Sequence, residues 1–290
     1  MKITAAVCTY ERYATLAATI CSLREQSLAA EDYEVLVLDS SRDGQRAREF
    51  AAEYSDAAKN LRFVRLNVPG LSNARNVAAA TAQTPLIAFI DDDALAASDW
   101  LEQIVATFAA ASADVAAVGG PVEPLWEAPR PSWLHDGLLG YLSVLDWGDR
   151  PLVLGQDRWL IGTNVAYRLE ALLATGGFRE DLSRRGDVLV SNEELELHDR
   201  LQAAGGRLFY SPAVRVTHRI PPARLTQAWF RRRIFWQAVS DLIACRVSTD
   251  LATPPAKGWW TGDTNDPKAF IRECRRITEL VQHLNAGRRS

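Results

Sequence analysis

The first 120 residues alternate between short apolar runs rich in Val, Ile and Leu and segments whose apolar residues recur at helical spacing. This alternation predicts strands joined by helices, the arrangement that builds a parallel sheet. The runs are almost continuously apolar, as in strands buried on both faces. We expect strands over 2–8, 34–38, 61–66, 85–90 and 115–118, and helices around 16–23 and over 45–54, 72–81 and 100–111. The sequence therefore predicts an α/β fold with a mostly parallel central sheet and helices on both faces.

The regular pattern ends at Gly119-Gly120-Pro121. Residues 121–158 are rich in Pro, Gly and Trp, which predicts a long irregular connection of a kind that is usually functional. Beyond it we expect strands over 159–168, 208–210 and 214–217, a short helix before Gly176-Gly177, and helices over 191–204, 227–246 and 267–284. We divide the chain into 1–120, 121–218 and a C-terminal helical appendage over 219–290.

Composition sets further limits. A chain of 290 residues that is 48% hydrophobic and 24% charged has the values of a globular protein. Its four cysteines show no CxxC spacing, which makes a structural zinc site or a redox motif improbable. We expect no membrane-spanning segment and no signal peptide, and therefore a cytoplasmic protein.

The charges are unevenly distributed along the chain. Residues 219–290 carry 13 Lys and Arg against 6 Asp and Glu, whereas residues 1–218 carry 20 against 30. The basic segment combines Arg231-Arg232-Arg233 with neighbouring Trp and Phe residues, which predicts a helix resting on an anionic membrane surface or meeting an anionic acceptor. The alternative is a packed helix whose arginines pair with the acidic body. We do not expect nucleic-acid binding.

Polar residues directly follow each of the first four expected strands. They lie in 9–12, 39–44, 69–76 and 91–93. The carboxyl ends of parallel strands meet at one edge, where such sheets bind ligands. The segment after the first strand contains no glycine, so the GxGxxG motif of dinucleotide-binding enzymes is missing. The sequence also lacks a P-loop and a GxSxG nucleophile elbow, which argues against P-loop NTPases and α/β-hydrolases.

The triplet Asp91-Asp92-Asp93 is the most informative of these segments. Three adjacent carboxylates at a buried strand end repel one another unless a cation offsets their charge, and their oxygens suit Mg²⁺ or Mn²⁺. The alternative is a solvated acidic turn before the next helix.

A set of motifs occurs in one order along the chain: TYER, VLDSSRDG, NARNVA, FIDDD, GTNVAYR, GGFRED, NEELELHDRL and SPAVRVTHR. In this order the chain resembles the family 2 glycosyltransferases of the GT-A fold, a Rossmann-like α/β fold, from residue 1 to about residue 245. A single motif would be weak, but the ordered set is specific. The resemblance implies that 1–120 form a nucleotide-sugar-binding half and 121–218 the acceptor-binding and catalytic half of one domain.

The resemblance also implies roles for single residues. The residues of the nucleotide-sugar site would be Thr9, Tyr10, Glu11, Arg12, Asp39, Arg75, Asp91 and Asp92. In this pattern Asp39 would contact the base and Arg75 the diphosphate. Asp91 and Asp93 match the acids of the DxD motif, with Asp91 toward the sugar and Asp93 on the metal. His218 occupies the position of the last metal contact, and the metal would be Mn²⁺ or Mg²⁺.

The catalytic base of the family comes from a Glu-Asp pair, and this chain departs from that form with Glu193-Glu194. By alignment Glu194 is the base. The segment Ser191-Asn192-Glu193-Glu194 also fits a capping box, in which Glu194 would bind the backbone and leave Glu193 to face the acceptor.

Acceptor contacts are expected from Trp159, Gly162, Thr163 and Asn164. The Trp residues of 121–158 are either sugar platforms or core residues. Arg184, Arg185, Gly186 and Arg224 are further candidates for phosphate or acceptor contacts.

The resemblance implies an inverting, metal-dependent enzyme of polysaccharide, glycolipid or glycoconjugate biosynthesis. Its donor would be a nucleoside-diphosphate sugar of the UDP, dTDP or GDP type, and its acceptor a saccharide or a lipid-linked saccharide. Contact with the inner face of the membrane through the basic C-terminal helix is part of this hypothesis. The alternatives are a sugar-phosphate nucleotidyltransferase and a sugar-nucleotide binding or docking protein without turnover.

Overall fold

The computed structural model describes residues 1–55, 60–184, 188–244 and 263–286. Its main sheet has eight strands in the order β3-β2-β1-β4-β9-β6-β10-β8. These strands are β1 (Ile3–Thr9), β2 (Tyr33–Asp39), β3 (Leu61–Arg65), β4 (Leu86–Asp91), β6 (Val115–Gly119), β8 (Leu152–Val153), β9 (Asn164–Arg168) and β10 (Arg207–Tyr210). The first four in space are parallel, β9 runs antiparallel to both its neighbours, and β8 is antiparallel to β10. The predicted mostly parallel sheet is confirmed.

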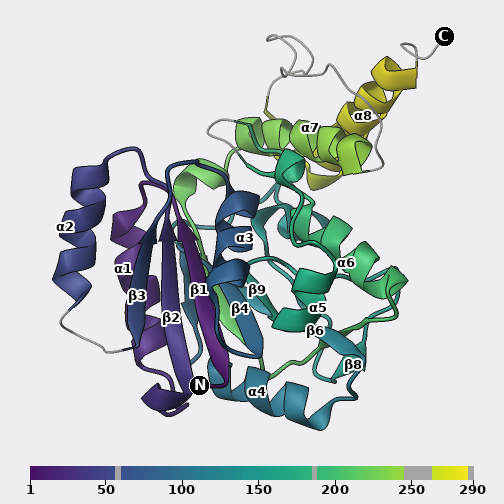
Figure 1. Cartoon of the computed structure of the whole chain (residues 1–290). Coiled ribbons are helices and arrows are strands. Elements are labelled where there is room, and N and C mark those ends of the chain that lie inside the picture. The colour runs from purple at the N-terminus through teal and green to yellow at the C-terminus, as the bar shows by residue number, and fades with distance from the viewer. Residues whose placement is uncertain (56–59, 185–187, 245–262, 287–290) are drawn as a thin grey trace.

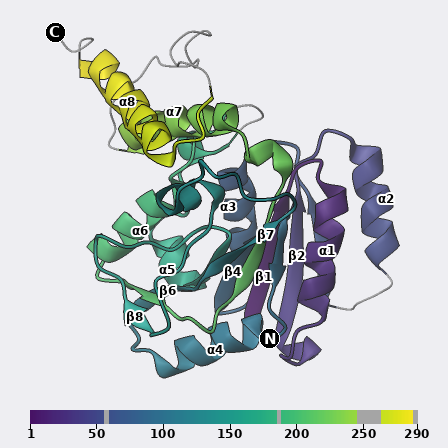
Figure 2. The same ribbon diagram turned by 180° about the vertical axis from the view of Figure 1, so that it is seen from behind.

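Helices cover both faces of the sheet, as Figures 1 and 2 show from opposite sides. They are α1 (Tyr13–Arg24), α2 (Gly44–Ser55), α3 (Leu71–Thr81), α4 (Trp100–Ala110), α5 (Leu169–Ala174) and α6 (Glu193–Ala203). Successive strand residues point to opposite faces. Val35 and Val37 of β2 therefore pack in the cluster of α1, α2 and α4, whereas Leu36 and Leu38 pack in that of α3, α5 and α6. This double burial explains the continuous apolar runs of the sequence.

A second, three-stranded sheet contains β5 (Ala94–Ala96), β11 (Val216–Ile220) and β7 (Val122–Trp126). The sequence analysis missed β5, and it treated β7 as part of an irregular connection. It also ended the last strand at Thr217, whereas His218 lies inside β11 and pairs with Ala94 of β5. The expected strand over 159–168 is half as long, because only Asn164–Arg168 is extended into the sheet.

The C-terminal helices α7 (Gln227–Ala244) and α8 (Pro267–Ala286) lie together at the end of the sheet toward which β1 and β2 run (Figure 1). They share an apolar cluster with the connection after β7, so Trp133 packs against Phe230 and Phe270. Trp133 is therefore a core residue and not a sugar platform. The division of the chain at residue 218 stays an interpretation, since this cluster crosses it.

The prediction that α7 exposes a basic and aromatic surface is wrong for most of the residues on which it depended. Arg231, Arg233, Phe235 and Trp236 are buried, and Arg231 forms ion pairs with Asp263 and Glu273. These partners belong to the C-terminal segment itself and not to the acidic body. Within the described ranges, no helix combines the length and the apolar character needed to cross a bilayer. Membrane contact stays a prediction without support from this helix face.

Gly120 provides a test of the packing between the two sheets. A Cβ atom at this position would lie 2.5 Å from the backbone oxygen of Ser211 and closer still to that of Val214. Because neither backbone oxygen is a flexible group that can turn aside, we expect Gly120→Ala to lower the free energy of unfolding by about 1–3 kcal/mol. Chemical denaturation measures the change. The control is Gly140→Ala, whose Cβ would meet no atom within 4 Å; equal stability losses in both variants would contradict the prediction.

Candidate active site

A cavity of about 1070 Å³ opens at the carboxyl ends of β1 and β4. Its wall also includes residues of the 3-10 helix Asp136–Leu142, the beginning of α6 and α7. It brings together residues that are far apart in the sequence. The sequence-predicted residues that line it are Thr9, Tyr10, Arg12, Arg75, Asp91, Asp92, Asp93, Trp159, Gly162, Thr163, Glu193, Glu194 and His218.

Three predicted site residues lie outside the cavity wall. Both carboxylate oxygens of Asp39 are used, one by the hydroxyl of Tyr13 at 2.9 Å and the other by the backbone N–H of Ser41 at 2.8 Å. Glu11 is exposed and accepts a hydrogen bond from the backbone of Arg42. Base recognition by Asp39 therefore stays a prediction that this arrangement does not favour.

Asn164 is the third of these residues, and it is 1% exposed. Its amide oxygen accepts from the indole N–H of Trp100 at 2.8 Å, and its amide nitrogen donates to the backbone oxygens of Pro121 and Val214. The side chain joins β9, α4 and the second sheet. The prediction that Asn164 contacts the acceptor is therefore wrong. Its side chain is buried and bonded to other parts of the protein, so it cannot reach a ligand.

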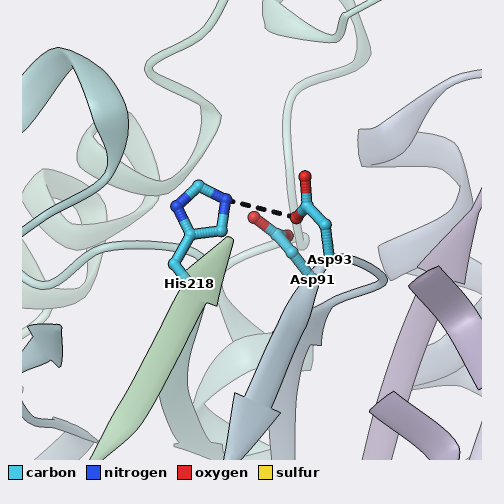
Figure 3. Close-up of side chains that lie close together, drawn as sticks. All are labelled: Asp91, Asp93 and His218. Carbon is cyan, nitrogen blue, oxygen red and sulfur yellow. Dashed lines mark ion pairs between the residues drawn. The ribbon is translucent and has the colours of Figure 1, made fainter. Parts of the chain in front are cut away.

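Asp91, Asp93 and His218 form a compact cluster where the end of β4 lies beside β11 (Figure 3). One ligand atom from each lies within 4.8 Å of the others, and Asp93 Oδ1 is 3.2 Å from His218 Nε2. Two carboxylates and an imidazole are donors suited to Mn²⁺, and the carboxylates also suit Mg²⁺. The residues present therefore fit a divalent cation.

The hydrogen bonds of His218 fix the orientation of its ring. Nδ1 lies 2.9 Å from the backbone oxygen of Leu142, which can only accept, so Nδ1 carries the proton. Nε2 lies 3.2 Å from Nη1 of Arg224, which can only donate. Nε2 also lies 3.2 Å from Asp93 Oδ1, so this nitrogen faces the cluster, while the bond of Nδ1 to Leu142 orients the ring, as a second hydrogen bond does for a metal-binding histidine.

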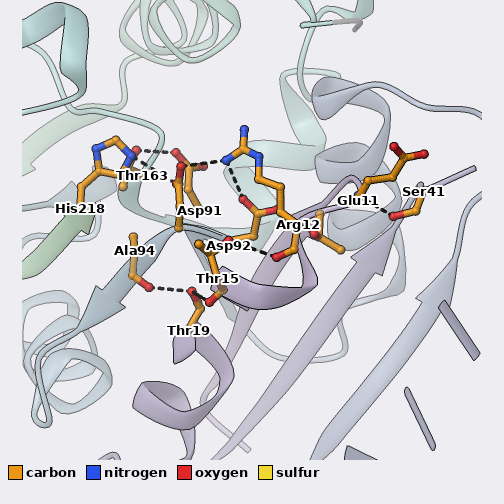
Figure 4. Close-up of polar contacts among 12 residues, drawn as sticks. Glu11, Arg12, Thr15, Thr19, Ser41, Asp91, Asp92, Ala94, Thr163 and His218 are labelled. Carbon is orange, nitrogen blue, oxygen red and sulfur yellow. Dashed lines mark hydrogen bonds and ion pairs between the residues drawn. The ribbon is translucent and has the colours of Figure 1, made fainter. Parts of the chain in front are cut away.

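Two arginines, Arg12 and Arg224, neutralise the acidic loop after β4, and Figure 4 shows the contacts of Arg12. Oδ2 of Asp93 accepts from Arg12 at 2.8 Å and from Arg224 at 2.9 Å, which leaves Oδ1 to face His218. Burial alone would raise the pKa of Asp93, but the hydrogen bond and charge of His218 and the two guanidinium groups lower it well below its ordinary value. Asp93 is therefore an anion at neutral pH.

Asp92 has a different environment from its neighbours. It accepts from the hydroxyl of Thr9 at 2.7 Å and from Arg12 at 3.0 Å. Burial outweighs the attraction of Arg12 and raises the pKa of Asp92 to about 7. The middle acid thus fixes Thr9 and Arg12 at the end of β1, and it does not belong to the Asp91, Asp93 and His218 cluster.

Arg75 connects the acidic loop to the beginning of α6. It is 3% exposed, donates to Glu193 Oε1 at 2.9 Å and lies 3.7 Å from Asp91 Oδ1. Its guanidinium also rests against the rings of Phe89 and Phe178. Arg75 therefore lies buried within the site and not on a solvated helix face.

The two glutamates at the beginning of α6 differ in their contacts. Glu193 is 3% exposed and bound to Arg75, whereas Glu194 is half-buried and its Oε2 has no hydrogen-bond partner within the described residues. The helix begins at Glu193 after Asn192, whose φ is 82°, and no side-chain capping bond forms. The capping-box alternative is therefore wrong. Burial and the charge of Glu194 raise the pKa of Glu193 to about 7 against the effect of Arg75.

Three of the predicted acceptor residues line the cavity, namely Trp159, Gly162 and Thr163. Trp159 is 39% exposed and packs edge-to-face against Trp147. Thr163 donates to Asp91 Oδ2 at 2.6 Å. At Gly162 a Cβ atom would lie 2.6 Å from Nη2 of Arg75, so the glycine is required by the approach of Arg75 to its backbone.

Several cavity residues were missed or only weakly signalled by the sequence. Arg184 and Arg224 were candidates and line the cavity, whereas Arg185 and Gly186 lie outside the described residues. The sequence analysis gave no individual site role to Ser40, Arg42, Tyr141 and Gln237. It interpreted the basic stretch 231–233, which includes Arg233, as a helix that rests on a membrane surface or meets an anionic acceptor.

Comparison with known proteins shows which family the chain resembles. Residues 4–133 match the family described as glycosyl transferase family 2. The chain carries a family 2 glycosyltransferase domain. It is 28% identical over 276 residues to the glucosyl-dolichyl phosphate glucuronosyltransferase of Haloferax volcanii, covering 94% of this chain and 83% of that protein. It is 27% identical to the succinoglycan biosynthesis protein ExoM of Rhizobium meliloti, covering 79% of this chain and 70% of that protein.

Solved structures show the same fold. The mannosyltransferase PcManGT of Pyrobaculum calidifontis, in complex with GDP-Man and Mn²⁺, superimposes with a TM-score of 0.59 at 21% identity over 99% of this chain and 75% of that chain. TarS 1–349 of S. aureus, in complex with UDP, gives a TM-score of 0.56 at 19% identity over 83% of this chain and 66% of that chain. The chain thus has the GT-A fold, and its family 2 match and its glycosyltransferase relatives support a transferase enzyme.

The raised pKa of Glu193 predicts a pH-dependent stability. The pKa is about 7 in the folded protein against 4.5 for a free side chain, so the folded state binds more protons between these values. Protonation of Glu193 therefore contributes fully to the unfolding free energy below pH 4.5. This contribution is lost as the pH rises toward 7, by at most about 1.4 kcal/mol per pH unit. In metal-free buffer, we expect the unfolding free energy to fall more steeply with pH in the wild type than in Glu193→Gln. Parallel profiles from urea titrations would contradict this.

Proposed function

We propose that this protein is an inverting, metal-dependent glycosyltransferase that moves a sugar from a nucleoside-diphosphate sugar to an acceptor hydroxyl. The observation that carries the proposal is the shared cavity of two acidic groups. Asp91, Asp93 and His218 lie at one side of Arg75, and the Glu193-Glu194 pair lies at the other. One group suits the diphosphate of a donor and its cation, and the other suits proton transfer from an acceptor.

Asp91, Asp93 and His218 would hold Mn²⁺ or Mg²⁺. When bound, the cation would supply electrostatic stabilisation of the charge that grows on the departing nucleoside diphosphate. Arg12 and Arg224, which now contact Asp93, add positive charge at the same place. Thr163 holds Asp91 in position through its hydroxyl. The complexes of structural neighbours with GDP-Man and Mn²⁺ and with UDP support this assignment.

The contacts of the two glutamates favour Glu194 as the base. Arg75 holds Glu193 as a buried partner, whereas Glu194 keeps an oxygen without a hydrogen bond. Glu194 would accept the proton of the acceptor hydroxyl while that oxygen attacks the anomeric carbon. The bond from the anomeric carbon to the diphosphate breaks with its electron pair on the diphosphate. A single displacement of this kind inverts the anomeric configuration.

The acceptor would be a saccharide or a lipid-linked saccharide in polysaccharide, glycolipid or glycoconjugate biosynthesis. Trp159 offers an exposed aromatic face to a sugar ring. The names of the relatives, a glucosyl-dolichyl phosphate glucuronosyltransferase and a succinoglycan biosynthesis protein, support this class.

The direct test is a panel of UDP-, dTDP- and GDP-sugars, assayed for release of nucleoside diphosphate with Mn²⁺, with Mg²⁺ and with EDTA. We expect release from at least one donor, and only with a metal present. The proposal fails if no donor is bound or hydrolysed with either metal. With an acceptor in hand, proton NMR of the product would show the opposite anomeric configuration to that of the donor.

The choice of base predicts a specific loss. We expect Glu194→Gln to lower the rate of transfer by about 10²–10⁴-fold, because general-base catalysis typically contributes that much. Donor binding, measured by calorimetry, should persist. Asp199→Asn is the matched control, since Asp199 lies exposed on the same helix. A Glu194→Gln enzyme with normal turnover would exclude Glu194 as the base.

The metal assignment predicts a difference between adjacent acids. Asp93→Asn removes a charged oxygen of the cluster and should raise the Mn²⁺ concentration needed for half-maximal nucleotide binding by at least about tenfold, the size of one charge-assisted contact. Asp92→Asn changes an acid outside the cluster, so its effect should be smaller. An equal requirement for Mn²⁺ in both variants would contradict the assignment.

A further inference from the structure

The end of the cavity beneath α7 contains a buried cation with unused donors. Arg233 is 7% exposed, and its Nη2 donates to Gln237 Oε1 at 2.8 Å and to Ser191 Oγ at 3.2 Å. Its Nε and Nη1 are buried without a hydrogen-bond partner among the described residues. A guanidinium group carries five N–H donors, so most of the hydrogen-bonding capacity of Arg233 is unused.

This environment is unfavourable for a charge. Burial and the nearby charge of Arg184 lower the pKa of Arg233 to about 10, so the group is still protonated at neutral pH. The two acceptors that it has, an amide and a hydroxyl, are neutral. A buried charge with neutral partners and unpaired donors costs several kcal/mol of folding free energy unless an anion joins it.

Arg184 adds a second positive charge at this end of the cavity. It lines the cavity, and over the described ranges its side chain forms no hydrogen bond or ion pair. By contrast, Arg12, Arg75 and Arg224 each contact a carboxylate of the site. Arg12, Arg75 and Arg224 are thus paired, whereas neither Arg233 nor Arg184 bonds to a carboxylate of the described residues.

The end of the cavity beneath α7 lies next to the glutamate pair at which the acceptor is expected to react. Ser191, which receives one hydrogen bond from Arg233, is three residues before Glu194. Tyr141, Leu189 and Trp229 also line the cavity and offer apolar and aromatic surface, and the guanidinium of Arg233 lies 5.9 Å from the centre of the Tyr141 ring. An acceptor whose hydroxyl reaches Glu194 therefore places its adjacent groups against Arg233 and Arg184.

We propose that Arg233 and Arg184 bind a phosphate group of the acceptor next to the saccharide that receives the sugar. The proposal rests on the function proposed above and deepens it by naming a phosphate-bearing acceptor. Two guanidinium groups offer more donors than one carboxylate can accept, whereas the terminal oxygens of a phosphate can take paired bonds from both. The phosphate replaces the neutral acceptors of Arg233 and satisfies its free donors.

The test compares two soluble probes that differ in charge. α-D-Glucose 1-phosphate and methyl α-D-glucoside are titrated into the full chain, saturated with Mn²⁺ and with the nucleoside diphosphate that it binds. We expect the phosphate to bind at least tenfold more tightly than the neutral glucoside. Arg233→Gln and Arg184→Gln should each weaken binding of the phosphate by about tenfold or more, the range of a charge-assisted hydrogen bond.

Controls separate anion binding from folding. Arg231→Gln alters a buried arginine of the same helix that pairs with Glu273 and does not line the cavity, so binding of the phosphate should be unchanged. Arg233→Lys keeps the charge and should recover part of the affinity. Nucleoside diphosphate affinity in each variant reports whether the donor side is folded. Equal binding of both probes, or unchanged phosphate binding in Arg233→Gln and Arg184→Gln, would overturn the proposal.

Two further experiments identify the source of the phosphate and separate this proposal from the proposed function. Decyl glucosyl phosphate in micelles tests the source of the phosphate: tighter binding than glucose 1-phosphate supports a lipid-linked acceptor, and equal binding supports a soluble glycosyl phosphate. If no nucleoside diphosphate binds with Mn²⁺, the proposed function fails. In that case, binding of α-D-glucose 1-phosphate to the wild type and to Arg233→Gln is compared without nucleotide. This comparison tests the phosphate site independently of the proposed function.

Discussion

The buried guanidinium of Arg75 is the interaction on which the arrangement of the site depends. It reaches from α3 to Glu193 at the beginning of α6 and to Asp91 at the end of β4. Three carboxylates, of Asp91, Glu193 and Glu194, surround this one cation and act on its pKa, which they raise despite the opposing effect of burial. Removing it would leave Glu193 buried without its ion-pair partner, at a cost of about 3–5 kcal/mol for a broken buried pair. The separation between the two acidic groups of the cavity is therefore fixed by one side chain.

The packing around this buried cation explains residues of the sequence motifs, including one that had been predicted to contact the acceptor. Gly162 is required because a Cβ atom would collide with Arg75, so its place in the acceptor wall is a consequence of packing. Asn76, the neighbour of Arg75, exchanges two hydrogen bonds with the backbone of Phe178, whose ring rests against Arg75. Gly177 leaves room for Asn76, since a Cβ atom there would be 2.5 Å from its amide oxygen. The NARN and GGF motifs are thus one structural unit around Arg75.

The features that could be predicted from the sequence are those that depend on a periodic pattern or on neighbouring residues. The parallel strands follow from apolar runs such as 34–38, and the acidic loop follows from its position after a buried strand. The second sheet could not be predicted in this way, because β5 has three residues and pairs with a strand 120 residues later. The same pairing puts His218 inside β11 and beside Asp93. Arg233 was misassigned for a related reason: charge suggests exposure, and only the tertiary contacts of α7 show that this arginine faces the cavity.

The C-terminal segment has a direct role in placing the glutamate pair. The backbone N–H of Ser191 donates to Ser240, and the side chain of Asn192 bonds with Gln237 and Asp241, all on α7. These bonds hold Asn192 in the left-handed conformation, with a φ of 82°, from which α6 begins. Left-handed backbone is unfavourable for a residue with a side chain, so contacts elsewhere must stabilise it. The orientation of Glu193 and Glu194 therefore depends on α7, and the same helix that positions the proposed base carries the arginine proposed to bind the acceptor.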